Sequence, residues 1–181
     1  MFGYVVVKLD YQYGWLNHKK VKIFEMLKVK ILCIGKIKEN YFIDALGEYA
    51  KRLIRYCDFC IDELAESKLK DETPTEIKKA LVEEGKNILK RVEGKLVLLD
   101  RVGKMVDSFD VANILKEASS TTGKVTFVIG SSHGVSQEVK DKADLTISFG
   151  KITFPHQLFR VVLAEQIYRG FCINAGSPYH K

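Results

Sequence analysis

Residues 147–181 read ISFGKITFPHQLFRVVLAEQIYRGFCINAGSPYHK, and this stretch joins the end of a strand to a long helix. The apolar residues of DLTISF (144–149) favour a β-strand, and GKITF (150–154) follows as a loop. Pro155 suits the first position of a helix, and apolar residues recur from there to residue 174, before a polar tail. Loops that follow the carboxyl ends of parallel strands hold the ligands of α/β proteins, so this loop is a candidate binding segment.

The same alternation of strand and helix extends backwards from this stretch to residue 27. Apolar, β-rich runs predict strands at 28–35, 57–64, 94–100 and 124–130. Helical spacing and start signals predict helices at 39–56, 73–92, 109–120 and 136–143, with residues 101–108 as a loop. Strands that alternate with helices imply a parallel sheet covered on both faces, so the expected fold class is a three-layer α/β fold.

Two of these helices begin with residues typical of helix starts. TPTE (73–76) has the form of a capping box, with Pro74 at the first helical position. In a capping box the side chains of Thr73 and Glu76 each bond the other residue's backbone N–H. Ser136 is the expected cap of the helix at 136–143.

The composition is that of one globular domain with a basic balance. The chain has 181 residues, of which 46% are hydrophobic, and its formal net charge is +6. We expect the domain to span residues 26–181, with residues 1–25 as an N-terminal extension to which the pattern assigns no role. The positive charge permits a polyanionic partner but does not require one, since many soluble enzymes are basic.

The cysteines and the hydropathy argue against several kinds of site. Cys57 and Cys60 form a C-x-x-C without a second pair of ligands, so we expect no metal. We expect these two, Cys33 and Cys172 to be reduced and mostly buried. No secretory signal is visible, and no run approaches the roughly 20 apolar residues of a membrane span. The expected location is therefore the cytoplasm, without membrane contact.

The sequence GSSHG (130–134) follows the apolar run VTFVI and matches the pattern of a serine nucleophile elbow. A hydrolase would also need an upstream oxyanion loop and a helix packed on the sheet, whereas the following helix is short and polar. We therefore interpret GSSHG as a glycine turn that brings backbone N–H groups close to a ligand. Asp100, this turn and the loop at 150–154 all follow carboxyl ends of predicted strands.

The stretch at 147–181 closely resembles the end of the SPOUT-class RNA methyltransferases. Within that class it is similar to the family that methylates N3 of a pseudouridine in bacterial large-subunit ribosomal RNA. MLKVKILCIGKIKENYF (26–42) resembles the first strand and helix of that family. LLD (98–100) and VTFVIG (125–130) lie in order between them, so the resemblance covers residues 26–181 and leaves 1–25 unmatched.

The resemblance implies a SPOUT fold whose C-terminal segment forms a trefoil knot, an exception to the rule that chains are unknotted. It implies S-adenosylmethionine as cofactor, a homodimer with each site near the partner's surface, and ribosomal RNA within the assembled ribosome as substrate. By position, the residues implied in cofactor binding are Leu99, Gly130, Phe149, Gly150, Lys151, Ile152, Thr153 and Phe154. The family has a second glycine where this chain has Ser131, which is strained there if the backbone needs a positive φ.

Four residues near the C-terminus are candidates for the reaction. Tyr179 and His180 are assigned to the acceptor nucleotide, by aromatic contact or proton handling, and Arg169 to a phosphate or ring anion. Glu165 either orients Arg169 or acts as the base. The pair His156 and Arg160 also lies four residues apart, on a different face of the same helix.

Other interpretations remain open at this stage. Glu165 and Arg169 have the spacing of an ordinary helix ion pair, His156 could cap the helix, and a polar C-terminus is commonly frayed. The rival functions are a SPOUT methyltransferase that acts on transfer RNA or on another ribosomal position, and a non-catalytic module that binds RNA. Candidate RNA contacts are the basic residues Lys36, Lys38, Lys51, Arg52 and Arg55, which could equally form a solvated helix face.

Overall fold

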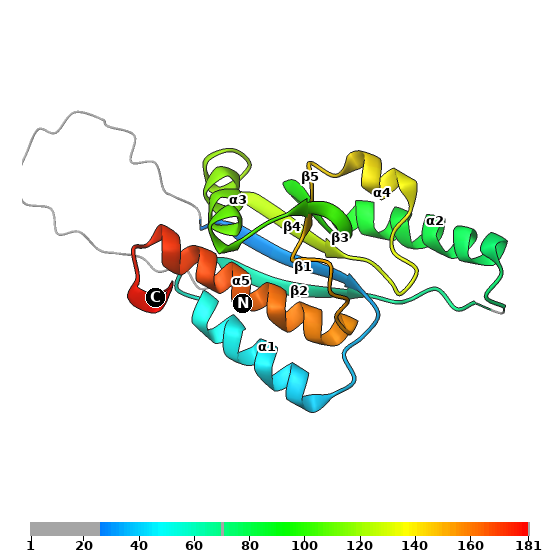
Figure 1. The fold of residues 1–181 in the computed structure, drawn as a ribbon, viewed down its shortest axis with the longest axis horizontal. Helices are drawn as coiled ribbons and strands as arrows, with labels where there is room; N and C mark the ends of the chain where they lie inside the picture. Colours follow the sequence, from blue (N-terminus) through cyan, green and yellow to red (C-terminus); the bar gives the residue numbers. More distant parts are fainter. Residues whose placement is uncertain (1–25, 70, 181) are drawn as a thin grey trace, which may run out of the picture.

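Five parallel strands form one sheet in the order β2-β1-β4-β3-β5 (Figure 1). The computed structural model describes residues 26–69 and 71–180, so the predicted extension at 1–25 lies outside the described residues. The strands are β1 (Lys28–Ile34), β2 (Asp58–Leu64), β3 (Lys95–Met105), β4 (Lys124–Ile129) and β5 (Leu145–Ser148). The helices are α1 (Asn40–Leu53), α2 (Pro74–Arg91), α3 (Ser108–Ser120), α4 (Gln137–Lys142) and α5 (His156–Asn174), followed by a 3-10 turn, η1 (Pro178–His180).

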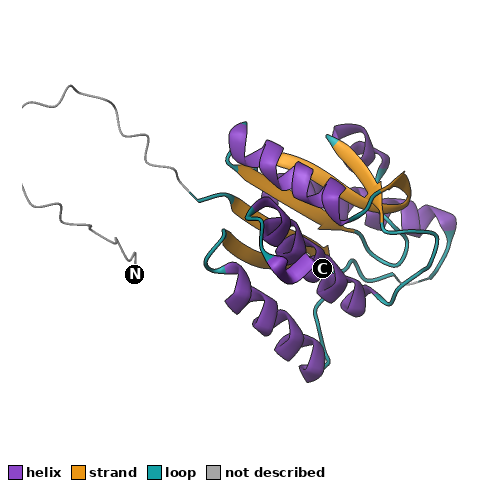
Figure 2. Ribbon diagram, turned by 60° about the vertical axis from the view of Figure 1, so that its left-hand side comes forward, coloured by secondary structure: helices purple, strands orange, loops and turns teal. Residues whose placement is uncertain are grey.

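Helices cover both faces of this sheet, as Figure 2 shows, and the predicted three-layer α/β fold is confirmed. Helices α1, α3 and α5 pack on one face, against alternate strand residues such as Val29, Ile31 and Phe127. Helices α2 and α4 pack on the other face, against residues such as Leu32 and Leu98. The alternation of the two sets along each strand follows from the two-residue period of a β-strand.

Strand β3 is longer than its sequence pattern indicates, and the prediction of a loop at 101–108 is wrong for residues 101–105. Leu99 and Lys104 both have Ile147 of β5 as partner, so β3 pairs with β5 in two registers separated by an irregularity. Residues 101–105 are mostly exposed and mix Arg and Lys with Val, Gly and Met, so they do not form the continuous apolar run of a buried strand. The trefoil knot concerns the path of the chain after β5 and stays a prediction.

The residues that cap the helices are partly those predicted from the sequence. Thr73 caps α2, because its hydroxyl accepts a hydrogen bond from the Glu76 backbone at 3.3 Å, and Pro74 is the first helical residue. The Glu76 carboxylate, however, pairs with Lys79 at 3.0 Å, so only half of the predicted capping box forms. A complete capping box joins Asp107 and Asp110 at the start of α3. Ser136 caps α4, as predicted.

The cysteines are free thiols, and three of the four are buried, whereas Cys60 is exposed. Burial raises the pKa of Cys33 and that of Cys57 to about 12, so both stay protonated at neutral pH. Over residues 26–69 and 71–180, no helix is both long and apolar enough to cross a membrane.

Arg160 is the most deeply buried charged side chain of the described domain, with 1% of its surface exposed. Its guanidinium donates hydrogen bonds to the Ile34 and Gly35 carbonyls, both at 2.9 Å, where β1 ends. It also pairs at 2.7 Å with the carboxylate of Glu63 on β2, which in turn accepts from the Ile37 backbone at 3.0 Å. Arg160 therefore fastens α5 to the carboxyl ends of β1 and β2, and has a structural role instead of the paired role with His156 considered above.

Replacing this guanidinium tests how much of the fold depends on it. We expect Arg160→Met to lower the free energy of unfolding by about 3–5 kcal/mol, because it leaves a carboxylate and two carbonyl groups without their donor. The measurement is urea unfolding followed by circular dichroism. Arg91→Met is the matched control. Arg91 forms an exposed ion pair with Asp62, the neighbour of Glu63 on β2, and this pair should contribute at most about 1 kcal/mol to the free energy of unfolding. Equal losses in the two variants would contradict the central role of Arg160.

Candidate functional site

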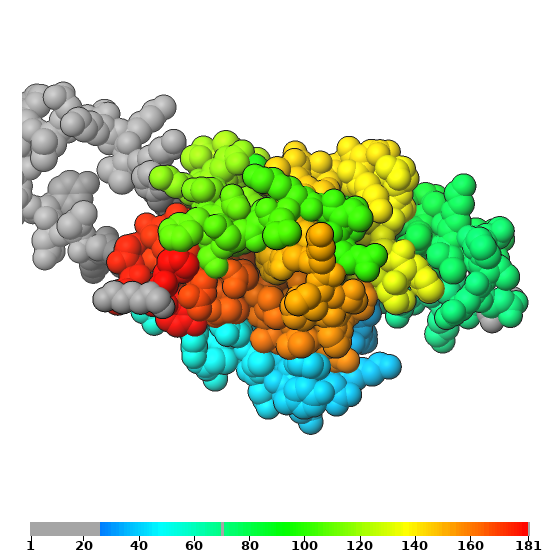
Figure 3. Space-filling model, in the orientation of Figure 1, coloured from blue at the N-terminus to red at the C-terminus, as the bar shows by residue number. Residues whose placement is uncertain are grey.

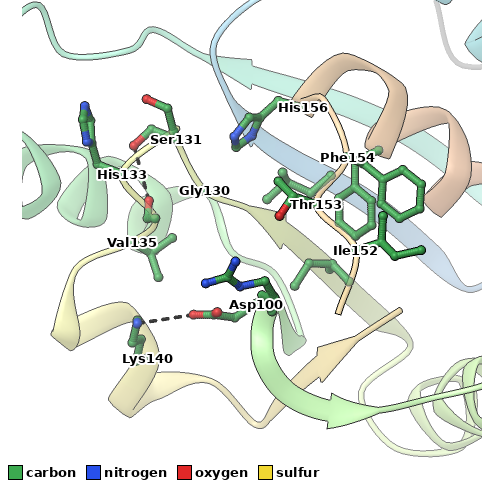
Figure 4. Close-up of a pocket in the computed structure, with 16 residues that line it drawn as sticks. Asp100, Gly130, Ser131, His133, Val135, Lys140, Ile152, Thr153, Phe154 and His156 are labelled. Carbon is green, nitrogen blue, oxygen red and sulfur yellow. Dashed lines mark hydrogen bonds and ion pairs between the residues drawn. The ribbon is translucent and has the colours of Figure 1, made fainter. Parts of the chain in front are cut away.

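A cleft of about 470 Å³ lies at the carboxyl edge of the sheet, where three segments of the chain meet (Figure 4). These are the part of β3 that follows Leu99, the GSSHG turn after β4, and the loop that leads from β5 into α5. In the space-filling view the orange segment before α5 lies at the surface, next to the green part of the chain around the end of β3 (Figure 3). Its lining comprises Leu99, Asp100, Arg101, Ile129, Gly130, Ser131, Ser132, His133, Gly134, Val135, Lys140, Ile152, Thr153, Phe154, His156 and Phe159.

The GSSHG turn closes on itself through backbone hydrogen bonds. The Ser131 N–H donates to the Gly134 carbonyl at 3.0 Å, and the Gly134 N–H donates to the Ser131 carbonyl at 2.9 Å. Gly130 has no room for a side chain, because a Cβ there would lie 2.4 Å from the Gly134 oxygen. The left-handed conformation of the turn falls on Gly134, with φ +91°. Ser131 is buried, and its hydroxyl donates to the Gly134 carbonyl at 3.3 Å, so serine is well accommodated where the family has glycine.

Ser132 does not have the surroundings of a nucleophile. It lies at the exposed tip of the turn, and no hydrogen bond joins it to a histidine within the described part of the chain. A serine nucleophile depends on such a base. The hydrolase interpretation of GSSHG therefore gains no support from the geometry.

The loop at 149–154 is held at both ends. At its start the Ser148 hydroxyl donates to the Gly150 carbonyl at 2.9 Å and accepts from the Gly150 N–H at 3.2 Å. At its end the ring of Phe154 stacks on Phe159 of α5, with centroids 5.8 Å apart. Phe149 also packs against Phe159, with its ring tilted and the centroids 5.6 Å apart. The loop between these anchors is exposed and faces the cleft.

Five of the eight residues predicted to bind the cofactor line the cleft, as the geometry brings together Leu99, Gly130, Ile152, Thr153 and Phe154. Phe149, Gly150 and Lys151 do not border it. Phe149 instead packs against the main core, and Gly150 receives the hydrogen bonds from Ser148.

Sequence reasoning missed part of the cleft. His156 does not cap α5, whose start has no side-chain cap; it lines the cleft. Lys140 reaches the cleft from α4 and pairs with Asp100 at 3.3 Å. Nothing in the sequence spacing relates His156 to Lys140, and the fold places both at the same cleft.

Three of the four predicted catalytic residues form a second cluster near the C-terminus. Arg169 donates to one oxygen of the Glu165 carboxylate, from Nε at 3.0 Å and from Nη2 at 2.6 Å. The Tyr179 hydroxyl donates to the same carboxylate, at 3.1 Å to its other oxygen. The Arg169 guanidinium also lies over the Tyr179 ring, 4.9 Å from its centroid. The tail is thus folded back on α5 instead of being frayed.

The surroundings of Tyr179 fix its protonation state. Burial first, and then the negative charge of Glu165, raise the pKa of Tyr179 above its ordinary value. The hydroxyl is therefore protonated at neutral pH and acts as a hydrogen-bond donor. A neighbouring ring, that of Tyr168, packs edge-on at 4.9 Å and limits its movement.

His180 lies outside this cluster. Its ring packs edge-on against Phe109 of α3, with centroids 4.6 Å apart. Its Nδ1 atom is buried and has no hydrogen-bond partner among residues 26–69 and 71–180. In this arrangement His180 contacts neither Glu165 nor Arg169.

The cleft and the cluster are two separate places on one chain. His156 begins α5 at the cleft, and Arg169 follows thirteen residues later on the same helix. At 1.5 Å per residue this corresponds to roughly 20 Å along the axis. Neither place holds three or more histidine, cysteine, aspartate or glutamate side chains grouped as metal ligands, within the described residues.

A family model described as predicted SPOUT methyltransferase matches residues 27–180. Ribosomal RNA large subunit methyltransferase H from Lactococcus lactis subsp. lactis is 45% identical over 159 residues, which cover 86% of this chain and 100% of the relative. Putative ribosomal RNA large subunit methyltransferase H from Methanococcus vannielii is 43% identical over 160 residues, with the same coverage. A solved structure, a probable methylase family protein from Haemophilus influenzae Rd KW20, has a TM-score of 0.49 at 13% identity, over 86% of this chain and 72% of that one. The family model spans nearly the whole described domain, and this chain belongs to the SPOUT methyltransferase family.

Proposed function

We propose that this protein transfers a methyl group from S-adenosylmethionine to N3 of a pseudouridine in large-subunit ribosomal RNA. The observation that carries the proposal is identity of 42–45% with relatives named as methyltransferases of that RNA, which are matched over their entire length. The choice of pseudouridine as the acceptor base and of N3 as the acceptor atom follows from the sequence resemblance at 147–181. Such a substrate would be met in the cytoplasm.

The cleft suits the proposed cofactor in size and in chemistry. A volume of about 470 Å³ lies within the range of roughly 300–1,000 Å³ that is typical of small-molecule sites. The side chains of Leu99, Ile129 and Phe154 offer an apolar surface to an adenine ring, while turn backbone and Thr153 offer polar groups. Asp100 supplies a negative charge at the wall, which favours a positively charged sulfonium. When bound, the cofactor supplies an electrophilic methyl group.

The residues of the C-terminal cluster would bind and orient the acceptor base. The Arg169 guanidinium provides positive charge for a phosphate or for the ring anion formed when N3 loses its proton. Tyr179 provides a ring for stacking and a hydroxyl donor. Both groups are bonded to Glu165, so we assign Glu165 the role of holding them in place. His180 would reach the base only after leaving Phe109.

The distance between cleft and cluster argues for a second copy of the chain at the active site. Transfer of a methyl group needs donor and acceptor in contact, yet the two places lie far apart along α5. Helix α5 also carries apolar residues on all sides, and those on its outer side are only half-buried. Helices that are apolar all round are normally covered, so a partner surface is expected there. In a homodimer the cluster of one protomer would complete the cleft of its partner.

Recognition of RNA would draw on the basic balance of the chain. Lys36, Lys38, Lys51 and Arg55 are exposed and remain candidates for phosphate contacts. Arg52, by contrast, is bonded to Glu48 at 3.0 Å and lies over two tyrosine rings, so it is already engaged within the fold.

Gly130→Ala tests the cofactor site. A methyl group at residue 130 collides with the Gly134 carbonyl and must displace the turn that borders the cleft. We expect S-adenosylmethionine to bind at least about tenfold more weakly, measured by titration calorimetry, which corresponds to roughly 1.4 kcal/mol. Gly47→Ala on α1 is the control, since its new methyl group meets no atom within 4 Å. Unchanged affinity in Gly130→Ala would place the cofactor elsewhere.

Mixing two inactive variants tests the shared site. Gly130→Ala impairs the cleft and Arg169→Ala impairs the cluster, so each homodimer should have little activity when the concentration of S-adenosylmethionine is well below the weakened Kd. When the two chains are co-expressed equally, half of the dimers are mixed, and each mixed dimer holds one intact pair of cleft and cluster. We expect roughly a quarter of wild-type methylation on ribosomes, as the statistics of a two-fold dimer require. No activity in the mixture would mean that each chain uses its own cluster.

Mass mapping of ribosomal RNA tests the reaction itself. In a strain that lacks this protein we expect one pseudouridine of large-subunit RNA to lose a single methyl group. Wild-type protein should restore that mass, and Arg169→Ala should not. Loss of a methyl group from transfer RNA instead would favour the transfer-RNA alternative. Unchanged RNA, together with no binding of S-adenosylmethionine, would favour the non-catalytic module.

A further inference from the structure

Glu84 is a buried carboxylate on the side of α2 that faces the sheet, with 4% of its surface exposed. One of its oxygens, Oε1, accepts a hydrogen bond from the Ser67 backbone at 2.8 Å. The other oxygen, Oε2, is also buried, and it has no hydrogen-bond partner among the described residues. Leaving a buried charged acceptor unpaired is costly, so native structures satisfy such groups with protein, water or ligand.

The carboxylate borders a small cavity of about 20 Å³ between α2 and the GSSHG turn. Its walls come from residues 66–69 after β2, from α2, and from Ser131 and His133 of the turn. A cavity needs roughly 10–15 Å³ to hold one water molecule, together with two or more polar partners. This cavity meets the size requirement, and three of its lining residues, Glu84, Ser131 and His133, have side chains that can bond a water molecule.

The same part of α2 also touches the segment that follows the turn. A Cβ on Gly85 would lie 2.2 Å from the hydroxyl oxygen of Ser136 and 3.3 Å from a methyl group of Val139. The helix can approach so closely only because residue 85 has no side chain. Glu84 and Gly85 therefore form the surface against which residues 131–136 are seated.

We propose that one ordered water molecule in this cavity joins Glu84 Oε2 to the GSSHG turn, and that Glu84 is thereby a positioning residue for the cofactor cleft. Ser131 and His133 line both the small cavity and the cleft, so they transmit any shift of the turn from one to the other. A water-mediated contact of this kind is nearly as favourable as a direct hydrogen bond. Glu84 does not touch the cleft, so it acts through the turn alone.

The consequence for the cofactor rests on the proposed function, whereas the seating of the turn does not. Glu84→Gln keeps the shape of the side chain and removes the charge that holds the water. Glu83→Gln is the matched control, because Glu83 is the preceding residue of α2 and is exposed. We expect Glu84→Gln to raise the hydrogen exchange of residues 131–136 in the free protein, and to weaken binding of S-adenosylmethionine by about 5- to 10-fold.

Kinetics separate positioning from a general loss of stability. In Glu84→Gln the KM for S-adenosylmethionine should rise by a similar factor, while kcat at saturating cofactor and the KM for ribosomes stay unchanged. Glu83→Gln should match wild type in every measurement. Ser131→Ala provides a second test from the other side of the cavity, and its effect should not add to that of Glu84→Gln.

Three outcomes would overturn the inference. The first is a uniform rise in exchange and a lower Tm with unchanged cofactor affinity, since that is a purely structural role. The second is additive effects of the two substitutions. The third is a high-resolution crystal structure in which Glu84 Oε2 bonds directly to the turn or to no water. If the wild-type protein fails to bind S-adenosylmethionine, the proposed function fails, and the exchange of residues 131–136 still decides the role of Glu84.

Discussion

The Arg160 guanidinium joins three parts of the chain that lie far apart in the sequence. It belongs to α5, near the C-terminus, and it bonds to the end of β1 and to Glu63 of β2. A buried charge of this kind must have its partners, because an unpaired guanidinium in the core would be expensive. The helix can therefore dock in only one position along its axis. Gln157, one turn earlier, adds to this restraint by accepting a hydrogen bond from the Lys38 backbone at 2.8 Å.

Fixing α5 in this way also fixes the cleft. The loop at 149–154 is short and spans the gap between β5 and the start of the helix, so its path depends on where α5 begins. Phe159, next to Arg160, packs against the rings of Phe149 and Phe154, which hold the two ends of this loop. On the opposite wall the GSSHG turn has its own backbone hydrogen bonds and rests on α2. Two of the three segments that form the cleft are thus anchored independently, one by each layer of helices.

The order of elements could be predicted from the sequence, because strand and helix periodicities are local properties. The extension of β3 to Met105 could not, since those residues form no continuous apolar run and are ordered by pairing with β5, more than forty positions away. The role of Arg160 could not be predicted either, because it depends on a partner far away in the sequence. Its spacing from His156 indicates a helix pair, whereas its true partner, Glu63, lies 97 residues earlier. The loop residues of the cleft were found through family resemblance, while Lys140 and His156 are brought there by tertiary packing, for which no local pattern exists.

The two halves of helix α5 have different surroundings: Arg160 in the first half is buried in the fold, whereas Glu165 and Arg169 in the second half remain partly exposed. Its first half holds Arg160 and Phe159, whose contacts require a rigid, buried position. Its second half holds Glu165 and Arg169, whose partly exposed side chains bind the tail and would have to meet an RNA base. A single continuous helix transmits the position of the first half to the second, since its backbone hydrogen bonds permit little bending without a break. The contacts of Arg160 would therefore set the position of the cluster on the proposed dimer surface as firmly as they set the cleft. Under the proposed function, substitution of Arg160 or Glu63 should disturb the cofactor site and the acceptor site together, although neither residue belongs to those sites.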